Sequence, residues 1–350
     1  MNQFQHTSLI VARESRGLTQ KELSEKTEIP QSTLSKFEGG VMNPDSDYLQ
    51  AISVQLDYPI SFFYRKMEIY PPNLHYRKRV VLPSKILARV EAIMNIYKTN
   101  LEELFKSVDF TQHYLPSAEQ MSNLTPQEAA RFLRQYWQLP KGVISNLTTL
   151  LESKGIVVIH FDFGTDKVDG RSIITKGGVP IVFINSVFPG DRQRFTLAHE
   201  LGHIVMHLFS PLSSMVDVEE EAFIFAAEFL APQNEIYPSL KNGLTIPKLA
   251  DLKRYWKISM QAIVYWAQRM GAITAAQAKY LWSQFNAQRI KQNEPIVIEK
   301  EAPTFLYDVI TFYLNRIKLS IDDLCATLCL DKVEFEQNYY SAINSLRLVR

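Results

Sequence analysis

The feature that most constrains this chain is a pair of histidines four residues apart, His199 and His203, which enclose Glu200 in the sequence HELGH. Residues at this spacing lie on one face of an α-helix, so both imidazoles can bind a single metal ion. A bound Zn²⁺ lowers the pKa of water to about 7 and stabilises the oxyanion formed when a carbonyl is attacked. Glu200 can accept the proton of that water. The spacing therefore predicts a helical HExxH zinc site with Glu200 as the catalytic base.

The residues around the motif favour a metal site over a solvated helix. The motif alone is a weak signal, because two histidines and a glutamate also occur together on many exposed helices. Here its neighbours are apolar: Leu197, Leu201, Ile204 and Val205. They predict a largely buried helix, in which unpaired histidines and a glutamate would cost free energy unless a metal satisfied them.

A zinc site of this kind needs a third protein ligand. The acidic run Glu219-Glu220-Glu221 opens the next apolar helix, and sixteen residues from His203 to Glu219 allow the chain to turn back. Spacing does not choose among these three glutamates, and Glu228 is a further candidate. His207 continues the histidine face by four residues, as an alternative ligand or a hydrogen-bond donor to the transition state. For such a helical histidine, we favour a role in orienting a ligand or in packing.

The pattern of apolar residues changes on the N-terminal side of the motif. Residues 156–163, 171–176 and 179–185 read as β-strands, and helical patterns flank them. The motif therefore belongs to a domain that combines helices with a small sheet.

The first sixty-five residues predict five short helices. Thr19 and Glu22 form a capping box, and Pro30 permits a tight turn. The next helix covers residues 31–38 and stops at Gly39-Gly40. Two short helices joined by a brief turn, the second polar at its start, are the arrangement of a helix-turn-helix.

In a helix-turn-helix, the second helix enters the major groove and its first side chains reach the base edges. Glutamine can pair with adenine, serine and threonine can donate or accept, and lysine can reach guanine or phosphate. The candidate DNA-binding residues are Gln31, Ser32, Thr33, Ser35 and Lys36. Leu34 and Phe37 are expected to hold the helix to its core.

Charge argues for a second contribution to DNA affinity. Residues 1–66 contain seven basic and eight acidic side chains, and the whole chain has a net charge of +1. Since phosphate contacts supply most of the affinity, this domain alone would bind weakly. A basic cluster of Arg77, Lys78 and Arg79, followed by Lys85 and Arg89, can supply those contacts. The alternatives are a protein-interaction module and a solvated linker; we favour DNA binding.

Two stretches resemble known families. The run from Arg13 to Gly40 resembles the repressor-type (XRE) helix-turn-helix family over about sixty residues. The run from Arg192 to His207, with the glutamate-rich helix that follows, resembles the ImmA/IrrE family of zinc metallopeptidases, which are gluzincin-like. This resemblance implies one Zn²⁺ per chain, bound by His199, His203 and Glu219, with Glu200 as base. The sequence departs from the family pattern at Phe223, where Asn or Asp is usual.

The expected fold is mainly α-helical with a small α+β domain. The predicted parts are a five-helix helix-turn-helix domain (1–66), a basic linker and connector helix (67–110), a gluzincin-like metallopeptidase domain with a short sheet (111–245), a helical extension (246–293) and a C-terminal helical region (294–350). Neither a signal peptide nor an apolar run of about 18 residues is evident, which favours a cytoplasmic protein with no membrane partner.

Together these parts predict a DNA-binding transcriptional regulator whose zinc metalloendopeptidase domain cleaves a repressor or antitoxin-like protein. The family resemblance implies such cleavage, often after stress. The main alternative is a non-proteolytic regulator whose peptidase-like domain senses a metal, a metabolite or a partner. A third reading is self-cleavage near Pro71-Pro72. Repressor-type modules usually bind palindromic double-stranded DNA as dimers, so a homodimer is expected.

Overall fold

The computed structural model describes residues 3–67, 83–106, 114–207, 217–241, 243–290 and 293–340. The described chain is mainly helical around one small sheet, as the sequence predicts. None of its helices is both long and apolar enough to cross a membrane.

The N-terminal part, here called the head (residues 3–67), has the five predicted helices. They are α1 (His6–Ser15), α2 (Gln20–Thr27), α3 (Gln31–Glu38), α4 (Ser46–Leu56) and the 3₁₀ helix η1 (Ile60–Tyr64). The capping box of Thr19 and Glu22 is present at the start of α2. In the turn between α2 and α3, Glu28 has φ 59°. This left-handed conformation is uncommon for a residue other than glycine.

A three-stranded sheet lies in the middle of the molecule. It consists of β1 (Val157–Phe161), β2 (Gly170–Ile174) and β3 (Pro180–Asn185), in the order β1-β3-β2. The central strand β3 pairs parallel to β1 and antiparallel to β2, which leaves β2 at an edge. All six residues of β3 are buried, as expected of a strand covered on both faces.

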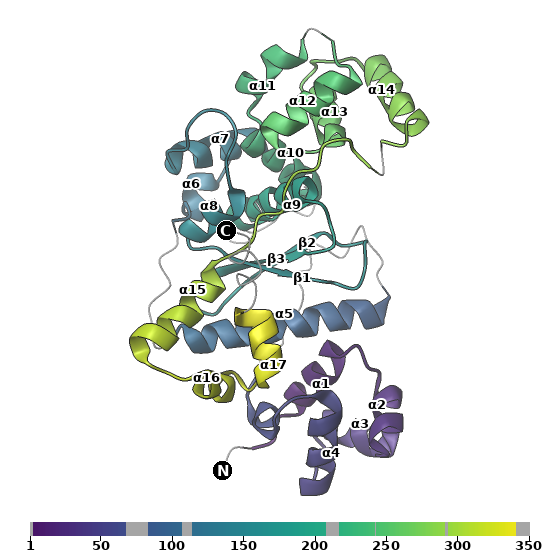
Figure 1. Cartoon of the computed structure of the whole chain (residues 1–350), viewed down its shortest axis with the longest axis vertical. Helices are drawn as coiled ribbons and strands as arrows, with labels where there is room; N and C mark the ends of the chain where they lie inside the picture. The colour runs from purple at the N-terminus through teal and green to yellow at the C-terminus, as the bar shows by residue number, and fades with distance from the viewer. Residues whose placement is uncertain are drawn as a thin grey trace, which may run out of the picture.

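The sheet separates two hydrophobic cores. Successive side chains of β3 point alternately into one core and the other. Val182 and Ile184 belong to the core shared with α9 (Gly190–Gly202) and α10 (Val218–Leu230). Ile181 and Phe183 belong to the core shared with α5 (Ser84–Leu104) and the head. Successive strand residues point to opposite faces, so one short strand serves both cores. In Figure 1 the long helix α5 lies between the sheet and the head.

The remaining helices complete the two sides. On the α9 side are α6 (Ala118–Met121), α7 (Pro126–Tyr136), α8 (Leu147–Ser153), α11 (Gln233–Leu240), α12 (Ile246–Trp256), α13 (Met260–Arg269) and α14 (Ala275–Ala287). On the α5 side are α15 (Phe305–Phe312), the π-helical turn η4 (Tyr313–Ile317), α16 (Ile321–Leu328), α17 (Lys332–Phe335) and the π-helical turn η5 (Glu336–Tyr340).

A strap, residues 293–304, joins these two sides and crosses the start of α9. Its carboxylate Glu301 binds Arg194 of α9 and accepts a hydrogen bond from the backbone N–H of Thr148 (2.9 Å). A Cβ on Gly190 would lie 2.4 Å from the carbonyl oxygens of Ile298 and Glu299, so only glycine permits this crossing. The strap therefore helps to fix the helix that carries the HExxH motif.

The head packs directly on the rest of the described chain. Helix α1 lies against α5, and Arg16 at the end of α1 forms an ion pair with Glu334 of α17 (2.6 Å). Lys85 of α5 forms an ion pair with Glu22 of α2 (2.6 Å). The C-terminal helices therefore return to contact the head.

Candidate metal centre and nucleic-acid interface

Helix α9 carries the HExxH motif into the core. It begins after Pro189, and the chain continues from it into a π-helical turn, η3 (His203–His207). Leu197 and Leu201 are fully or almost fully buried, as the sequence predicts. A Cβ on Gly202 would lie 3.0 Å from the ring of Phe225 and 3.3 Å from Cα of Ala222, so this glycine lets α9 and α10 approach closely.

This close approach brings a carboxylate to the two histidines. His199, His203 and Glu219 offer ligand atoms that all lie within 4.8 Å of one another. A Glu219 carboxylate oxygen lies 3.4 Å from Nε2 of His199, and the other lies 3.6 Å from Nε2 of His203. The two Nε2 atoms are 3.1 Å apart. His199 and Glu219 are partly exposed, so solvent reaches one side of the group.

The other candidate glutamates have different partners. Glu220 pairs with Arg269 (2.5 Å), and Glu221 lies 3.0 Å from Nε2 of His207. Glu228 is fully buried and pairs with Arg131 (2.7 Å). Neighbouring residues on a helix point about 100° apart, so when α10 packs on α9 only Glu219 of the three consecutive glutamates faces His199 and His203.

His207 lies beside the group rather than in it. Its Nδ1 is 2.9 Å from Nδ1 of His203, and its Nε2 faces Glu221. Because His203 directs its Nε2 toward Glu219, the contact with His207 occupies the opposite nitrogen of the same ring. An arrangement of this kind fixes the orientation of a ligating imidazole.

Glu200 is buried next to the group, with 2% of the residue exposed. One of its carboxylate oxygens accepts a hydrogen bond from the hydroxyl of Ser172 on β2 (2.7 Å). Burial raises the pKa of Glu200 above its ordinary value, while the nearby His199 and the hydrogen bond from Ser172 act in the opposite direction. Ser172 was not singled out from the sequence, because a lone serine on a strand belongs to no motif.

The donor set fits Zn²⁺. Two imidazole nitrogens and one carboxylate, open to solvent on one side, match the three protein ligands of catalytic zinc sites. Calcium and magnesium prefer ligand sets made up of oxygen atoms, whereas two of the three ligands here are imidazole nitrogens. In the part of the chain that the structure describes, no other cluster of His, Cys, Asp or Glu has such a geometry.

Phe223, the residue that departs from the family pattern, lies one turn after Glu219 on α10. Its ring packs against Phe195 of α9 (centroids 5.0 Å apart) and against Tyr265 of α13 (4.6 Å). A polar side chain in this place would lose those aromatic contacts. Phe223 is therefore part of an aromatic cluster with Phe195 and Tyr265, one helical turn from Glu219.

Helix α3 presents the candidate DNA-binding residues outward. Gln31, Ser32, Ser35 and Lys36 are exposed and Thr33 is partly exposed, whereas Leu34 and Phe37 are fully buried. The helix is held by a buried ion pair between Arg13 of α1 and Glu38 (2.6 Å), and Gln20 of α2 also donates to Glu38 (2.8 Å). This polar face is accessible to solvent, as a groove-reading helix requires.

The proposed phosphate-binding cluster is described only in part. Arg77, Lys78 and Arg79 lie outside the described residues. Lys85 pairs with Glu22, and Arg89 donates to the carbonyl of Asp162 (3.3 Å). These last two side chains therefore also join α5 to neighbouring elements.

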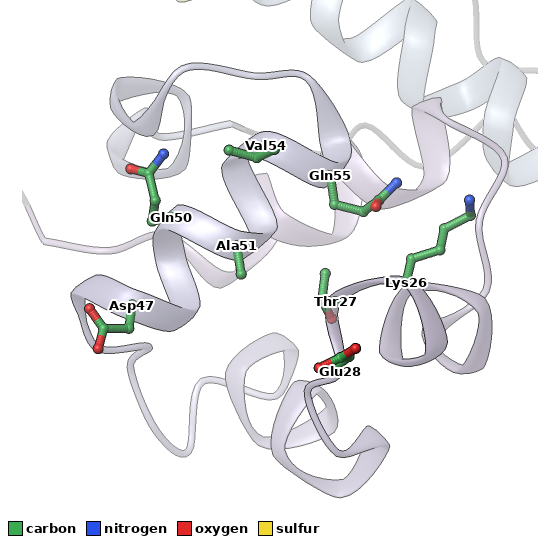
Figure 2. A pocket seen from close by; sticks show the side chains of 8 residues that line it. All are labelled: Lys26, Thr27, Glu28, Asp47, Gln50, Ala51, Val54 and Gln55. Carbon is green, nitrogen blue, oxygen red and sulfur yellow. The ribbon is translucent and has the colours of Figure 1, made fainter.

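A shallow hollow on the head lies between the end of α2 and the outer side of α4 (Figure 2). Its volume is about 540 Å³, and none of the five candidate residues of α3 lines it. Lys26 is the only cation among its lining residues, beside Glu28 and Asp47. This mixed charge does not suit a phosphate group.

Comparison with known families supports both the metal group and the helix-turn-helix described above. Residues 9–63 match the family model for a helix-turn-helix, and residues 151–267 match the model for the IrrE N-terminal-like domain. The chain carries both domains. No curated protein matches it significantly. The resemblance predicted from the sequence is therefore confirmed, and the chain is a DNA-binding regulator with a metallopeptidase-like domain.

The IrrE-like segment includes β1, β2, β3, α9 and α10, and thus every residue of the metal group together with Ser172 and Glu200. It ends within α13. Helix α14 and the strap lie beyond it, as do the C-terminal helices that contact the head.

Proposed function

We propose that this protein is a DNA-binding transcriptional regulator whose IrrE-like domain is a zinc-dependent metalloendopeptidase. Its substrate would be a repressor or antitoxin-like protein. The observation that carries the proposal is the convergence of His199, His203 and Glu219 within 4.8 Å, beside the buried carboxylate of Glu200. His199, His203 and Glu219 would hold one zinc ion per chain.

Zinc, when bound, supplies Lewis acidity that polarises the carbonyl of the scissile bond and makes water more acidic. Glu200 would take the proton from the attacking water and return it to the leaving nitrogen. The Ser172 hydroxyl, 2.7 Å from the carboxylate, holds Glu200 in one orientation for both transfers. His207 holds the ring of His203 so that its Nε2 faces the ligand side.

The head would bring this activity to double-stranded DNA. Gln31, Ser32, Thr33, Ser35 and Lys36 are proposed to contact bases or nearby phosphates, and Arg77, Lys78 and Arg79 to add phosphate contacts. Two copies are proposed to bind a palindromic site as a homodimer, because repressor-type heads use two half-sites.

The test compares wild-type protein with the Glu200→Gln variant. Each is loaded with zinc, its zinc content is measured by mass spectrometry, and it is then incubated with a candidate repressor protein. We expect about one zinc per chain in both, and cleavage slowed by a factor of about 10²–10⁴ in the variant. Cleavage that persists unchanged in Glu200→Gln would contradict the mechanism.

The same experiment separates the alternatives. A protein that binds zinc and DNA but cleaves none of the partners would be a regulator that senses through its peptidase-like domain. Fragments of the protein's own chain, formed on long incubation with zinc, would indicate self-cleavage. A protein without zinc after reconstitution would contradict the proposed enzyme.

A further inference from the structure

A cavity of about 1020 Å³ is lined by residues of α9, α10, α13, α14 and the strap. Helix α9 contributes Phe195 and Thr196 to its wall, α10 contributes Phe223, and α13 contributes Tyr265. Phe195 and Thr196 precede His199 by one turn, and Phe223 follows Glu219 by one turn, so cavity and metal group share the facing sides of two helices. The volume is at the upper end of the roughly 300–1,000 Å³ of small-molecule pockets.

Half of the residues that line this cavity are apolar or aromatic, and they include a cluster of three rings. Phe223 packs edge-on against Tyr265 and lies 5.0 Å from Phe195 between ring centroids. The other apolar or aromatic residues of the lining are Val187, Phe188, Pro189, Ala262, Trp282, Ile296 and Val297, and the uncharged polar ones are Thr196, Ser259, Gln261 and Asn293. At its rim Val187 is 52% exposed, Tyr265 40% and Val297 85%. Exposed apolar groups gathered beside a hollow mark a binding surface.

Every charged side chain in the lining already has a partner within the protein. Arg192 pairs with Asp169 (2.6 Å), and Lys253 pairs with both Asp191 and Glu294 (2.8 Å each). The ammonium group of Lys300 donates to the carbonyl of Ser186 (2.6 Å). The three cations balance the three carboxylates, so the cavity offers no net charge for an ionic ligand.

The strap forms part of the wall and is itself fixed. Glu294 accepts hydrogen bonds from the backbone N–H groups of Met260 (2.8 Å) and Gln261 (3.2 Å) at the start of α13. Trp282, Ile296 and Val297 lie outside the segment that matches the IrrE-like family model. The cavity is therefore completed by residues that this chain adds to the shared domain.

From these observations we infer that the cavity is a specificity pocket for a large uncharged side chain of the cleaved protein, aromatic or long aliphatic, located next to the scissile bond. The identity of this occupant rests on the proposed function, because a substrate positioned at the metal group would extend along the same faces of α9 and α10. The apolar walls select for a bulky hydrophobic group, and the paired charges give no favourable contact to an acidic or basic one.

The first test measures binding without catalysis. Full-length Glu200→Gln protein is titrated with the uncharged fluorescent dye Nile red, and the dye is then displaced with N-acetyl-phenylalanine amide or, at equal concentrations, with the corresponding aspartate and lysine amides. We expect saturable binding and preferential displacement by the phenylalanine compound. Equal displacement by all three amides would overturn the inference.

Two variants locate the bound dye. Ala262→Trp fills the cavity from α13, and Val297→Asp places a charge at its rim on an exposed residue where folding is not at stake. Each should weaken dye binding at least tenfold. Ala276→Trp on the exposed side of α14 is the matched control and should bind as the parent does. Unchanged binding in both cavity variants would overturn the inference.

The second test identifies the occupant. Zinc-loaded protein with Glu200 intact is incubated with a mixture of peptides, and the cut bonds are identified by mass spectrometry. We expect a large apolar residue at one fixed position beside the cut, and a shift toward small residues in Ala262→Trp. Cuts without such a preference would overturn the inference while supporting the proposed function. An absence of cuts would contradict the proposed function, and the dye titration would still decide whether the pocket accepts apolar groups.

Discussion

Helices α9 and α3 both carry candidate functional residues, but on α9 these residues lie on the buried face of the helix and on α3 they lie on the exposed face. On α9 the polar residues face inward, and Glu200 and His203 are each only 2% exposed. On α3 the polar residues face solvent, while Leu34 and Phe37 are fully buried. Buried polar groups need partners, so the chemistry of α9 depends on the packing around it. The polar face of α3 needs only a stable helix beneath it. The following four substitutions test this contrast.

The largest effect on function is expected from His199→Ala in the metal group, where zinc binding should be lost altogether. Removal of one of three protein ligands should abolish tight zinc binding, so the variant should contain no zinc where the wild-type protein has about one per chain. Zinc at 100 times its dissociation constant stabilises a protein by about 2.7 kcal/mol, and this gain should disappear. Thermal unfolding with and without zinc measures it. A zinc-dependent rise in Tm that survives the substitution would exclude the proposed site.

The next effect concerns the buried side of α3. Leu34→Ala should destabilise the protein by about 2–5 kcal/mol, because a fully buried leucine leaves a cavity when it is shortened. Denaturant unfolding gives the value. Val54→Ala, at a residue 71% exposed on α4, is the control and should change stability by less than about 0.5 kcal/mol. Similar losses for both would mean that Leu34 does not anchor the helix.

A substitution on the exposed side of α3 should weaken DNA binding and leave the stability of the protein unchanged. Gln31→Ala should weaken binding to the cognate DNA by about 1–3 kcal/mol if it contacts a base, with no change in Tm. Binding is measured by fluorescence anisotropy at fixed salt. Gln50→Ala, in the hollow of Figure 2, offers the same change of side chain away from α3. An equal loss of affinity in both variants would argue against base contacts by α3.

The smallest effect is expected at Ser172, which contacts the proposed catalytic base Glu200 rather than the metal group. Ser172→Ala removes the hydrogen bond to Glu200 and should reduce kcat about tenfold, equivalent to about 1.4 kcal/mol, with unchanged zinc content. Ser153→Ala on the exposed end of α8 is the control. Full activity in Ser172→Ala would show that packing alone orients Glu200.

The contrast also explains what could be predicted from the sequence. Local signals were sufficient for the head: the bounds of α3 are those expected between Pro30 and Gly39, and the capping box of Thr19 and Glu22 is present. Helix breakers and caps act within a few residues, so they can be recognised without the fold. The buried face of α9 was also predicted, from its apolar neighbours.

Contacts between distant segments could not be predicted in this way. The sequence left Glu219, Glu220 and Glu221 equivalent, because only the packing of α10 on α9 determines which one faces the histidines. Ser172 is 28 residues from Glu200 and has no motif of its own. The contacts of the strap are also of this kind: its Glu294 and Glu301 form buried ion pairs with Lys253 of α12 and Arg194 of α9.

The shared strand β3 has a consequence for anyone who would divide this protein into pieces. Its side chains alternate between the core of the IrrE-like domain and the core that contains the head. Separation of the chain near residue 66 would therefore uncover apolar surface on both α1 and α5. The head and the IrrE-like domain are therefore linked through the packing of α5 and the sheet. A DNA-reading module transplanted from this protein should be designed to take its neighbouring helix with it.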